Sequence, residues 1–276
     1  MKNNIFRNII AGVLVVSTAF AVFACSSKTE DKKDDKTITI GASVTPHSEI
    51  LNQAKDILAK EGITINVVEI EDVTSPNTGV IEGKLDANFF QHQPYLDDFN
   101  KENNCNLVSI GAVHYEPFGI YSSKISSLSE LTDGAKIAVP NNTTNEARAL
   151  LLLQQEGIIK LKDDAGILAS VNDIIDNPLN IEFVEIDPAQ LVHSLPDVSA
   201  AVINGNYAIE GGLSVKDALA VEANDGLAAQ TYANILVTDA KNKDNESLKK
   251  LAEVLQGEEI KSFINGKYDG AVVPIN

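Results

Sequence analysis

Two kinds of hydrophobic pattern follow one another along the chain from residue 37 onward. Residues 37–40 and 63–70 alternate between apolar and polar positions, which is typical of strands with one buried face. Between them, residues 48–60 carry apolar side chains three and four positions apart, and Gly62 provides a stop, so we predict a helix. The short connections indicate a parallel strand pair with the helix packed over it.

The same succession of short apolar runs and helical spacing continues toward the C-terminus. Further helices are predicted over 94–103, 145–156 and 188–195, and the last long helix carries its apolar stripe within 248–255. Further strands are predicted over 85–90, 107–113, 118–121, 136–139, 181–186, 199–203 and 232–237. Strands that alternate with helices in this way place the chain in the α/β class.

The length of the patterned region, about 240 residues, favours two sheets over one. We expect the chain to cross between two lobes near residues 122–124 and 229–232. Residues 37–122 and 233–276 would then form lobe 1, and residues 123–232 would form lobe 2. Two lobes joined by two crossing segments make a hinged clamp, and ligands bind in such interdomain clefts.

A short positive head, an apolar run and a cysteine open the chain. Lys2 and Arg7 precede an apolar stretch over 9–23, and Cys25 follows it closely. This layout is typical of a secretion signal that is cleaved before a cysteine, so we predict a lipoprotein signal peptide over 1–24 and a lipid on Cys25. The alternative is an uncleaved transmembrane anchor, but the apolar run is shorter than the roughly 20 residues that span a bilayer.

Residues 25–36 form the predicted lipidated cysteine and a flexible leash, because residues 26–36 contain no apolar side chain. The protein would work outside the cytoplasm, held at the cell membrane or outer membrane by a palmitate-type lipid anchor. Removal of residues 1–24 takes the formal net charge from −17 to −19, since it deletes two positive charges and no negative ones. A chain this acidic, without a basic cluster, does not favour nucleic acid as a partner.

Several classes of chemistry find no support in the sequence. Phosphate loops, nucleophile elbows and zinc-protease motifs are missing, so we do not expect an enzyme or a bound cofactor. With Cys25 lipidated, Cys105 has no disulfide partner and is expected to be a buried thiol. No metal site is predicted, because no ligand spacing links the four histidines His47, His92, His114 and His193.

The segment 86–95 is the first candidate for binding chemistry. Phe89, Phe90 and His92 lie at the end of a predicted strand, just before a helix, and ligands of open α/β sheets bind at such strand ends. Adjacent strand residues face opposite sides, so at least one of the two phenylalanines is expected in the core.

The polar loop 140–145 is the second candidate, because it leads into a helix whose free N–H groups favour an anion. Arg148, one turn into the helix, could hold a carboxylate with two parallel hydrogen bonds. A solvated arginine paired with Glu146 or another acid is an equally good interpretation.

Two asparagines are further candidates. Asn234 lies inside an otherwise apolar strand, where an amide costs free energy unless it is paired, so it needs a ligand or a backbone partner. Asn204 follows a buried strand, where a helix cap explains it as well as a ligand does.

Five segments together resemble a known family, in the expected order and over almost all of the chain after the leash. They are 46–51 (PHSEIL), 86–95 (DANFFQHQPY), 113–122 (VHYEPFGIYS), 144–150 (TNEARAL) and 204–208 (NGNYA). They are similar to the NlpA-type lipoproteins, the methionine-binding lipoproteins of ABC importers.

This resemblance implies a two-lobed periplasmic-binding-protein fold, type II-like, with a ligand cleft between the lobes. It implies capture of methionine, most often the L form, and delivery to a membrane permease driven by a cytoplasmic ATPase. By position, Arg148 would bind the ligand carboxylate with support from Asn145. The remaining implied contacts are Asn204 and Asn234 for the polar groups, and Phe89, Phe90 and His92 for the side chain.

Other functions stay open at this point. The same receptor role could serve another amino acid or a methionine-containing dipeptide. A surface lipoprotein that acts as an adhesin is an alternative from a different class, and an exposed apolar patch away from the cleft would favour it.

Overall fold

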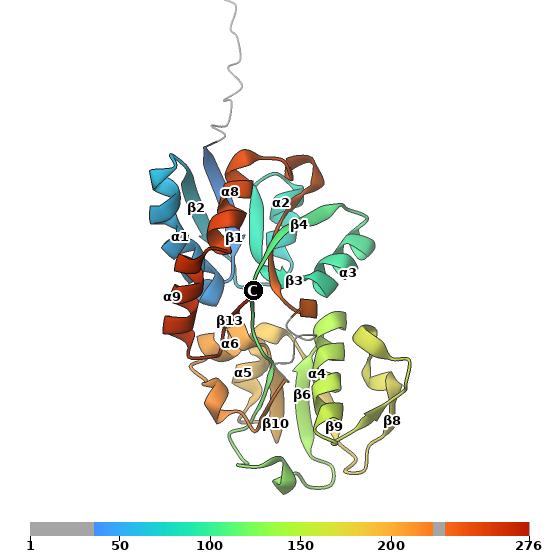
Figure 1. Ribbon diagram of the computed structural model, residues 1–276. Helices are drawn as coiled ribbons and strands as arrows, with labels where there is room; N and C mark the ends of the chain where they lie inside the picture. Colours follow the sequence, from blue (N-terminus) through green and yellow to red (C-terminus); the bar gives the residue numbers. More distant parts are fainter. Residues whose placement is uncertain (1–35, 223–229, 276) are drawn as a thin grey trace, which may run out of the picture. The chain divides into compact units, whose positions relative to one another are not determined.

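The computed structural model describes residues 36–222 and 230–275 (Figure 1). The predicted signal peptide, Cys25 and nearly all of the leash lie outside the described residues, so they remain predictions. Within the described ranges, no helix is both long and apolar enough to cross a membrane.

The first sheet has six strands in the order β13-β4-β12-β3-β1-β2. Its strands are β1 (Thr37–Ala42), β2 (Thr64–Glu69), β3 (Ala87–His92), β4 (Leu107–Tyr115), β12 (Asn234–Asp239) and β13 (Val273–Pro274). Its helices are α1 (Glu49–Lys60), α2 (Ser75–Ile81), α3 (Gln93–Asn103), α8 (Glu246–Leu255) and α9 (Glu258–Tyr268). A short kinked segment, η1 (Val44–Ser48), precedes α1.

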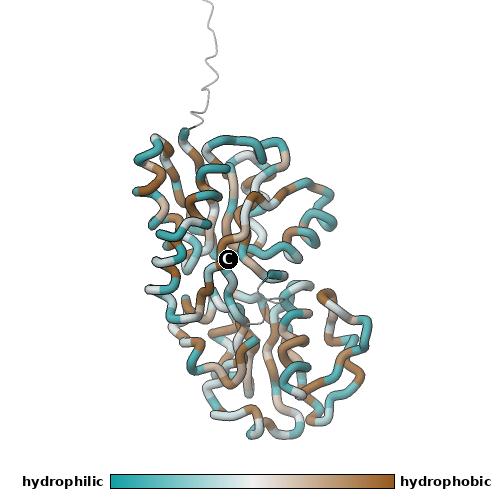
Figure 2. The backbone as a smooth tube through the Cα atoms, in the orientation of Figure 1, coloured by the Kyte–Doolittle hydropathy of each residue, from teal (hydrophilic) through white to brown (hydrophobic). Residues whose placement is uncertain are grey.

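The predicted unit of strand, helix and strand opens this sheet. β1 pairs in parallel with β2 and with β3, and α1 connects β1 to β2. Leu51 and Leu58 of α1 are fully buried in the same core cluster as Leu251 of α8, so the apolar stripes of both helices face one core. Figure 2 shows the consequence along α1 and α9, where hydrophobic and hydrophilic segments alternate.

The second sheet has five strands in the order β11-β5-β10-β6-β9. Its strands are β5 (Gly119–Tyr121), β6 (Lys136–Pro140), β9 (Glu182–Ile186), β10 (Ala200–Ile203) and β11 (Ala220–Val221), and β7 (Lys160–Leu161) and β8 (Ile174–Asp176) form a separate pair. Its helices are α4 (Thr143–Gln155), α5 (Leu191–Ser194) and α6 (Gly205–Glu210). The described residues also contain single 3-10 turns: η2 (Leu128–Glu130), η3 (Gly166–Leu168), η4 (Val171–Asp173), η5 (Pro188–Gln190), η6 (Val215–Asp217) and η7 (Ala240–Asn242).

The chain passes between the two sheets twice. The first passage lies between the end of β4 at Tyr115 and the start of β5 at Gly119, earlier than the predicted seam at 122–124, because β5 pairs with β10. The second lies between β11 and β12, and only part of it is described. The division into lobes at 37–122 plus 233–276 and 123–232 remains a proposal, and sheet membership favours the earlier first seam.

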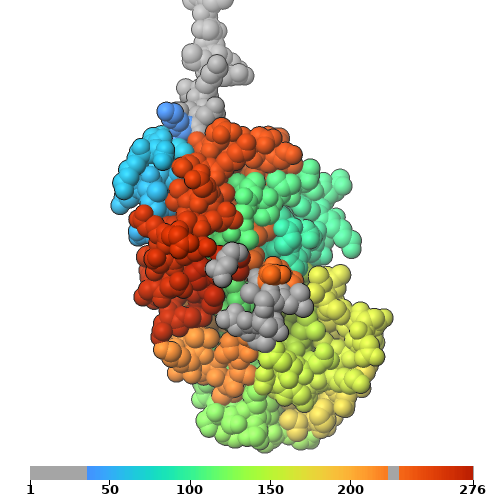
Figure 3. Space-filling view, viewed as in Figure 1, coloured from blue at the N-terminus to red at the C-terminus, as the bar shows by residue number. Residues whose placement is uncertain are grey.

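The C-terminal segment returns to the first sheet through β12 and β13. Figure 3 shows the last part of the chain (red) packed beside the N-terminal elements (blue) of the same sheet. The helix predicted over 248–255 is present as α8, but it is not the last long helix, because α9 follows it with a buried face that includes Ile260 and Ile264. The α/β class is confirmed, with helices and strands alternating through both sheets.

Candidate functional site

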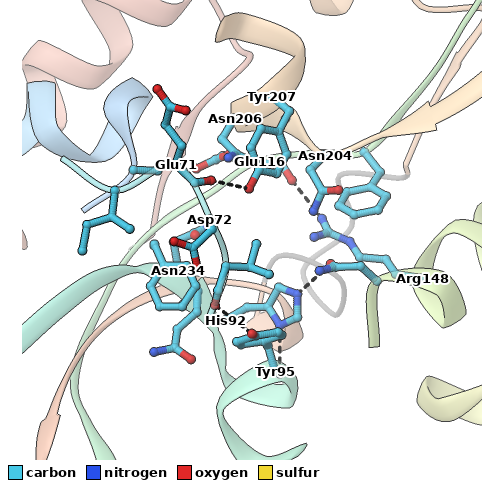
Figure 4. A pocket seen from close by; sticks show the side chains of 18 residues that line it. Glu71, Asp72, His92, Tyr95, Glu116, Arg148, Asn204, Asn206, Tyr207 and Asn234 are labelled. Atoms are coloured by element: carbon cyan, nitrogen blue, oxygen red, sulfur yellow. Dashed lines mark hydrogen bonds between the residues drawn. The ribbon is translucent and has the colours of Figure 1, made fainter. Parts of the chain in front are cut away.

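One cavity collects side chains from both sheets (Figure 4). Strand ends and loops of the first sheet, together with α3, contribute Ser43, Ile70 to Val73, Phe90 to His92, Tyr95, Glu116 and Asn234. Phe118, Asn145, Arg148 and the segment from Asn204 to Tyr207 line the rest. The β1, β2 and β3 contributions come from the carboxyl ends of parallel strands, which is where α/β sheets bind ligands.

The structure brings together six of the seven predicted binding residues: Phe90, His92, Asn145, Arg148, Asn204 and Asn234. Phe89 is not among the residues that line this cavity. Its side chain is fully buried in the core, where its ring lies edge-on against His47 at 4.7 Å and His114 at 5.3 Å. The alternation of β3 explains the difference, because adjacent side chains of a strand face opposite sides.

His92 connects the two walls of the cavity. Its Nδ1 accepts a hydrogen bond from the backbone N–H of Tyr95 at 3.2 Å and thereby caps α3. Nε2 is therefore the protonated nitrogen, and it donates to Asn145 Oδ1 at 3.0 Å. Burial, reinforced by the positive charge of Arg148, lowers the pKa of His92 to about 4, so the imidazole is neutral at physiological pH.

Arg148 is buried, and its carboxylate partner is within the protein. Nε and Nη2 donate to the Glu222 carboxylate at 2.9 and 2.5 Å, and Nη2 also donates to the backbone carbonyl of Glu116 at 2.8 Å. The guanidinium carbon lies 4.0 Å from the ring centre of Phe118 and 4.4 Å from that of Tyr232.

The solvated pair of Arg148 with Glu146, considered from the sequence, does not form. Arg148 is 3% exposed, and Glu146 accepts a hydrogen bond from the backbone N–H of Val171 at 2.9 Å instead. The expected double hydrogen bond to a carboxylate does exist, but it joins Arg148 to Glu222, which the sequence did not single out.

Asn234 has the internal partner that its place in a strand requires. Its Oδ1 lies 2.9 Å from His47 Nε2, and because an amide oxygen only accepts, His47 donates from Nε2. His47 Nδ1 then accepts from the Ser43 hydroxyl at 2.5 Å. This chain of hydrogen bonds fixes the amide at the wall of the cavity.

Asn204 occupies the N-cap position of α6, but its side chain makes no capping hydrogen bond. Its Oδ1 is buried, and no described group donates to it. A buried acceptor without a donor costs free energy, so this oxygen is available to a donor that enters the cavity.

Glu116 is a lining residue that the sequence reasoning quoted within a motif but gave no role. It is 4% exposed and accepts a hydrogen bond from His114 Nε2 at 2.6 Å, with His47 Nε2 at 3.5 Å. Burial raises the pKa of the Glu116 carboxyl, although His47 and Arg148 oppose the shift.

The same three residues, His47, His114 and Glu116, place one potential ligand atom each within 4.8 Å of one another. Among the described residues, they are the group whose donors approach closely enough for a metal ion. Both Nε2 atoms already serve hydrogen bonds, to Asn234 and to Glu116, so the geometry is that of a hydrogen-bond network. The fold thus gathers two of the histidines that the sequence left scattered.

The sequence is similar to known proteins over most of its length. The model of the NlpA lipoprotein family matches residues 38–276. The D-methionine-binding lipoprotein MetQ of Salmonella typhimurium is 40% identical over 267 residues, which cover 95% of each chain.

Solved structures share the fold. The nutrient binding protein from Burkholderia cenocepacia bound to methionine has a TM-score of 0.82 and 44% identity, over 87% of this chain and 100% of that one. The methionine binding protein MetQ has a TM-score of 0.84 and 39% identity, over 88% and 99%. This likeness confirms the predicted fold, that of a solute-binding protein.

Proposed function

Because the chain belongs to the NlpA lipoprotein family, we propose that it is an extracytoplasmic solute-binding protein that captures methionine and delivers it to an ABC importer. The observation that carries this proposal is a buried cation and a buried anion on the wall of one cavity, Arg148 and Glu116. A free amino acid presents the complementary pair, a carboxylate and an ammonium group on one carbon atom. Methionine in the names of the relatives supports the choice of side chain.

The polar head of the ligand would be held from both walls. We assign its carboxylate to Arg148, with Asn145 one turn earlier on α4. We assign its ammonium group to the Glu116 carboxylate, with the free acceptor Asn204 Oδ1 as a second partner. Charge-assisted hydrogen bonds in a buried site are the strong ones, so these contacts would fix the head.

The thioether side chain would lie along the aromatic part of the wall. The rings of Phe90 and Tyr95 meet edge to face with centres 5.8 Å apart, and Ile70 and Val73 add apolar lining. Sulfur contributes roughly 0.3–1.5 kcal/mol per aromatic contact, so such a wall favours methionine over an aliphatic side chain of similar size.

Two hydrogen bonds join the walls beside this space, from His92 to Asn145 and from Tyr207 Oη to the backbone carbonyl of Glu71 at 3.3 Å. They connect elements of the first sheet with helices of the second. A ligand that contacts both walls would favour this closed arrangement, to the extent that it binds the closed form more tightly than the open form.

The proposed attachment to the membrane is based on the sequence. A lipid on Cys25 and the leash over 25–36 would tether the domain outside the cytoplasm, within reach of a permease and its ATPase. The role proposed is binding without catalysis, as in the relatives, which are named as binding proteins.

Composition provides a direct test. Residues 26–276 contain no methionine, so total amino-acid analysis of this fragment reads bound methionine without background. We expect a stoichiometric amount, and titration calorimetry of the stripped protein with each enantiomer would give the affinity. Arg148→Ala should lose the ligand with an unchanged circular dichroism spectrum, whereas the exposed Lys136→Ala should retain it.

A different bound amino acid or a dipeptide would keep the receptor role and replace the ligand. A protein that carries nothing and ignores a panel of amino acids and dipeptides would refute the proposal and favour the adhesin alternative.

A further inference from the structure

The carboxylate of Glu222 occupies one whole edge of the Arg148 guanidinium. Nε lies 2.9 Å from Oε1 and 3.1 Å from Oε2, and Nη2 lies 2.5 Å from Oε2. The pair is almost fully enclosed, since the side chains of Arg148 and Glu222 are 4% and 10% exposed. Glu222 is not among the residues that line the cavity, so it contacts Arg148 from outside the cavity lining.

A donor count shows what this leaves for a ligand. A guanidinium has five N–H groups, one on Nε and two on each terminal nitrogen. Glu222 takes the Nε donor and one Nη2 donor, and the Glu116 carbonyl takes the other at 2.8 Å. Among the described residues, none accepts a hydrogen bond from Nη1, so Nη1 is the one nitrogen available to the cavity.

Glu222 is itself held in place. Its Oε2 accepts from the Tyr115 hydroxyl at 2.5 Å and from the Phe118 backbone N–H at 3.3 Å, and its own N–H donates to the Phe118 carbonyl at 2.8 Å. Such a carboxylate has little freedom to turn away from Arg148.

These partners belong to the two passages between the sheets. Tyr115 ends β4 and Phe118 precedes β5, while Glu222 follows β11 and Tyr232 precedes β12. The guanidinium carbon lies over the rings of both Phe118 and Tyr232. Arg148 is therefore anchored where the two sheets connect, and not to one wall alone.

We propose that Glu222 is a positioning residue for ligand recognition: it cancels the charge of Arg148 and fixes the guanidinium so that Nη1 alone reads the ligand carboxylate. This inference rests on the proposed function. A neutral pair with a fixed orientation selects a carboxylate by the direction of the hydrogen bond that it offers, whereas a free arginine would attract any anion. Glu222 would thus set how well the site distinguishes a carboxylate from an anion of another shape.

The first test needs no ligand. Arg148 is the only arginine in residues 26–276, so the ¹⁵N spectrum of this fragment has a single arginine Nε–H signal. We expect this signal to be protected from exchange at neutral pH and to lose protection in Glu222→Gln. Rapid exchange in the unaltered protein, or unchanged protection in the variant, would overturn the proposal.

The second test measures selectivity with methionine and its α-aminophosphonate analogue, in which a tetrahedral phosphonate replaces the planar carboxylate. We expect the ratio of their affinities to fall at least about tenfold in Glu222→Gln, consistent with loss of oriented hydrogen bonds to a charged group. Glu222→Asp should recover part of the ratio, and the exposed Glu182→Gln should leave it unchanged.

The two tests separate the possible failures. Equal loss of both ligands in Glu222→Gln would indicate a merely structural role, and an unchanged or increased ratio would also overturn the proposal. If Glu222→Gln does not fold, Tyr115→Phe removes one hydrogen bond to Glu222 and should reduce the ratio to a smaller extent. Absence of methionine binding in the unaltered protein would refute the proposed function, while the Nε–H signal would still decide the role of Glu222.

Discussion

Glu116 differs from Glu222 because it has no arginine side-chain partner of its own. The Arg148 guanidinium is committed to Glu222, and its contact with Glu116 is to the backbone carbonyl. The Glu116 carboxylate is left with two imidazoles that burial keeps neutral, since the pKa of His47 is lowered to about 4 and that of His114 to about 3. A buried carboxylate among neutral groups is suited to an incoming ammonium group.

This arrangement predicts how methionine binding depends on pH. Burial raises the pKa of Glu116 above its ordinary value, and the protonated acid cannot pair with an ammonium group. We therefore expect affinity to be highest above this pKa and to fall as pH falls through it, at pH values where the α-carboxyl of the ligand, with a pKa of about 3.5, is still ionised. Titration calorimetry between pH 7.5 and pH 5 measures the effect. Glu116→Gln should bind more weakly at pH 7.5 and without this dependence, and an identical pH profile in the variant would exclude Glu116 as the ammonium partner.

Two asparagines at equivalent helix positions differ in what they do. Asn245 caps α8, because its Oδ1 accepts from the backbone N–H of Leu248 at 3.1 Å. Asn142 holds the same position before α4, but its side chain makes no capping bond and both of its polar atoms are buried without a partner. A side chain therefore caps the N-terminus of α8, whereas no side-chain cap is formed at the N-terminus of α4.

Substitution by alanine should separate the two positions. Asn245→Ala should lower the free energy of unfolding by about 1 kcal/mol, the usual value of an N-cap hydrogen bond. Asn142→Ala should be neutral or stabilising, because it removes two unsatisfied polar atoms. Urea denaturation of both variants measures the difference, and equal losses would show that α4 depends on its asparagine after all.

Elements were easier to predict from the sequence than the contacts between them. The strand, helix and strand over 37–70 follow from local periodicity, and β1, α1 and β2 appear there. The Gly-containing helix α2 was missed because its seven residues, SPNTGVI, lack a helical stripe. Helix 188–195 divides into η5 and α5, a difference that apolar spacing does not encode.

The candidate site shows the same limit. Asn204 and Asn234 could be selected because polar groups within or beside buried strands need partners, and Arg148 because it lies one turn into a helix whose N-terminus favours an anion. The partner of Arg148 lies 74 residues away, and an isolated glutamate in VEAN carries no local signal. The family resemblance supplied positions that periodicity could not, but it placed Phe89 in the pocket where strand alternation puts it in the core.

At the scale of the whole molecule, three buried histidines connect the site to stability. His47, His92 and His114 are 6% exposed or less, and each makes a hydrogen bond that uses the neutral imidazole. Burial is the largest cause that lowers the pKa of each one. Unfolding exposes all three to water, where their pKa returns to about 6.5.

Acid should therefore destabilise the protein well above the range in which carboxylates usually titrate. Each histidine has a folded pKa below its unfolded value, so the unfolded state binds more protons and stability falls as pH falls from about 6.5 toward 4. Each contributes up to about 1.4 kcal/mol per pH unit, and the raised pKa of Glu116 opposes part of the total. Urea denaturation from pH 7.5 to pH 5 measures the slope. His92→Gln should reduce the slope by about one proton, and the exposed His193→Gln should leave it unchanged. A free energy of unfolding that stays constant over this range, or an equal slope in His92→Gln, would show that His92 is not held neutral by the fold.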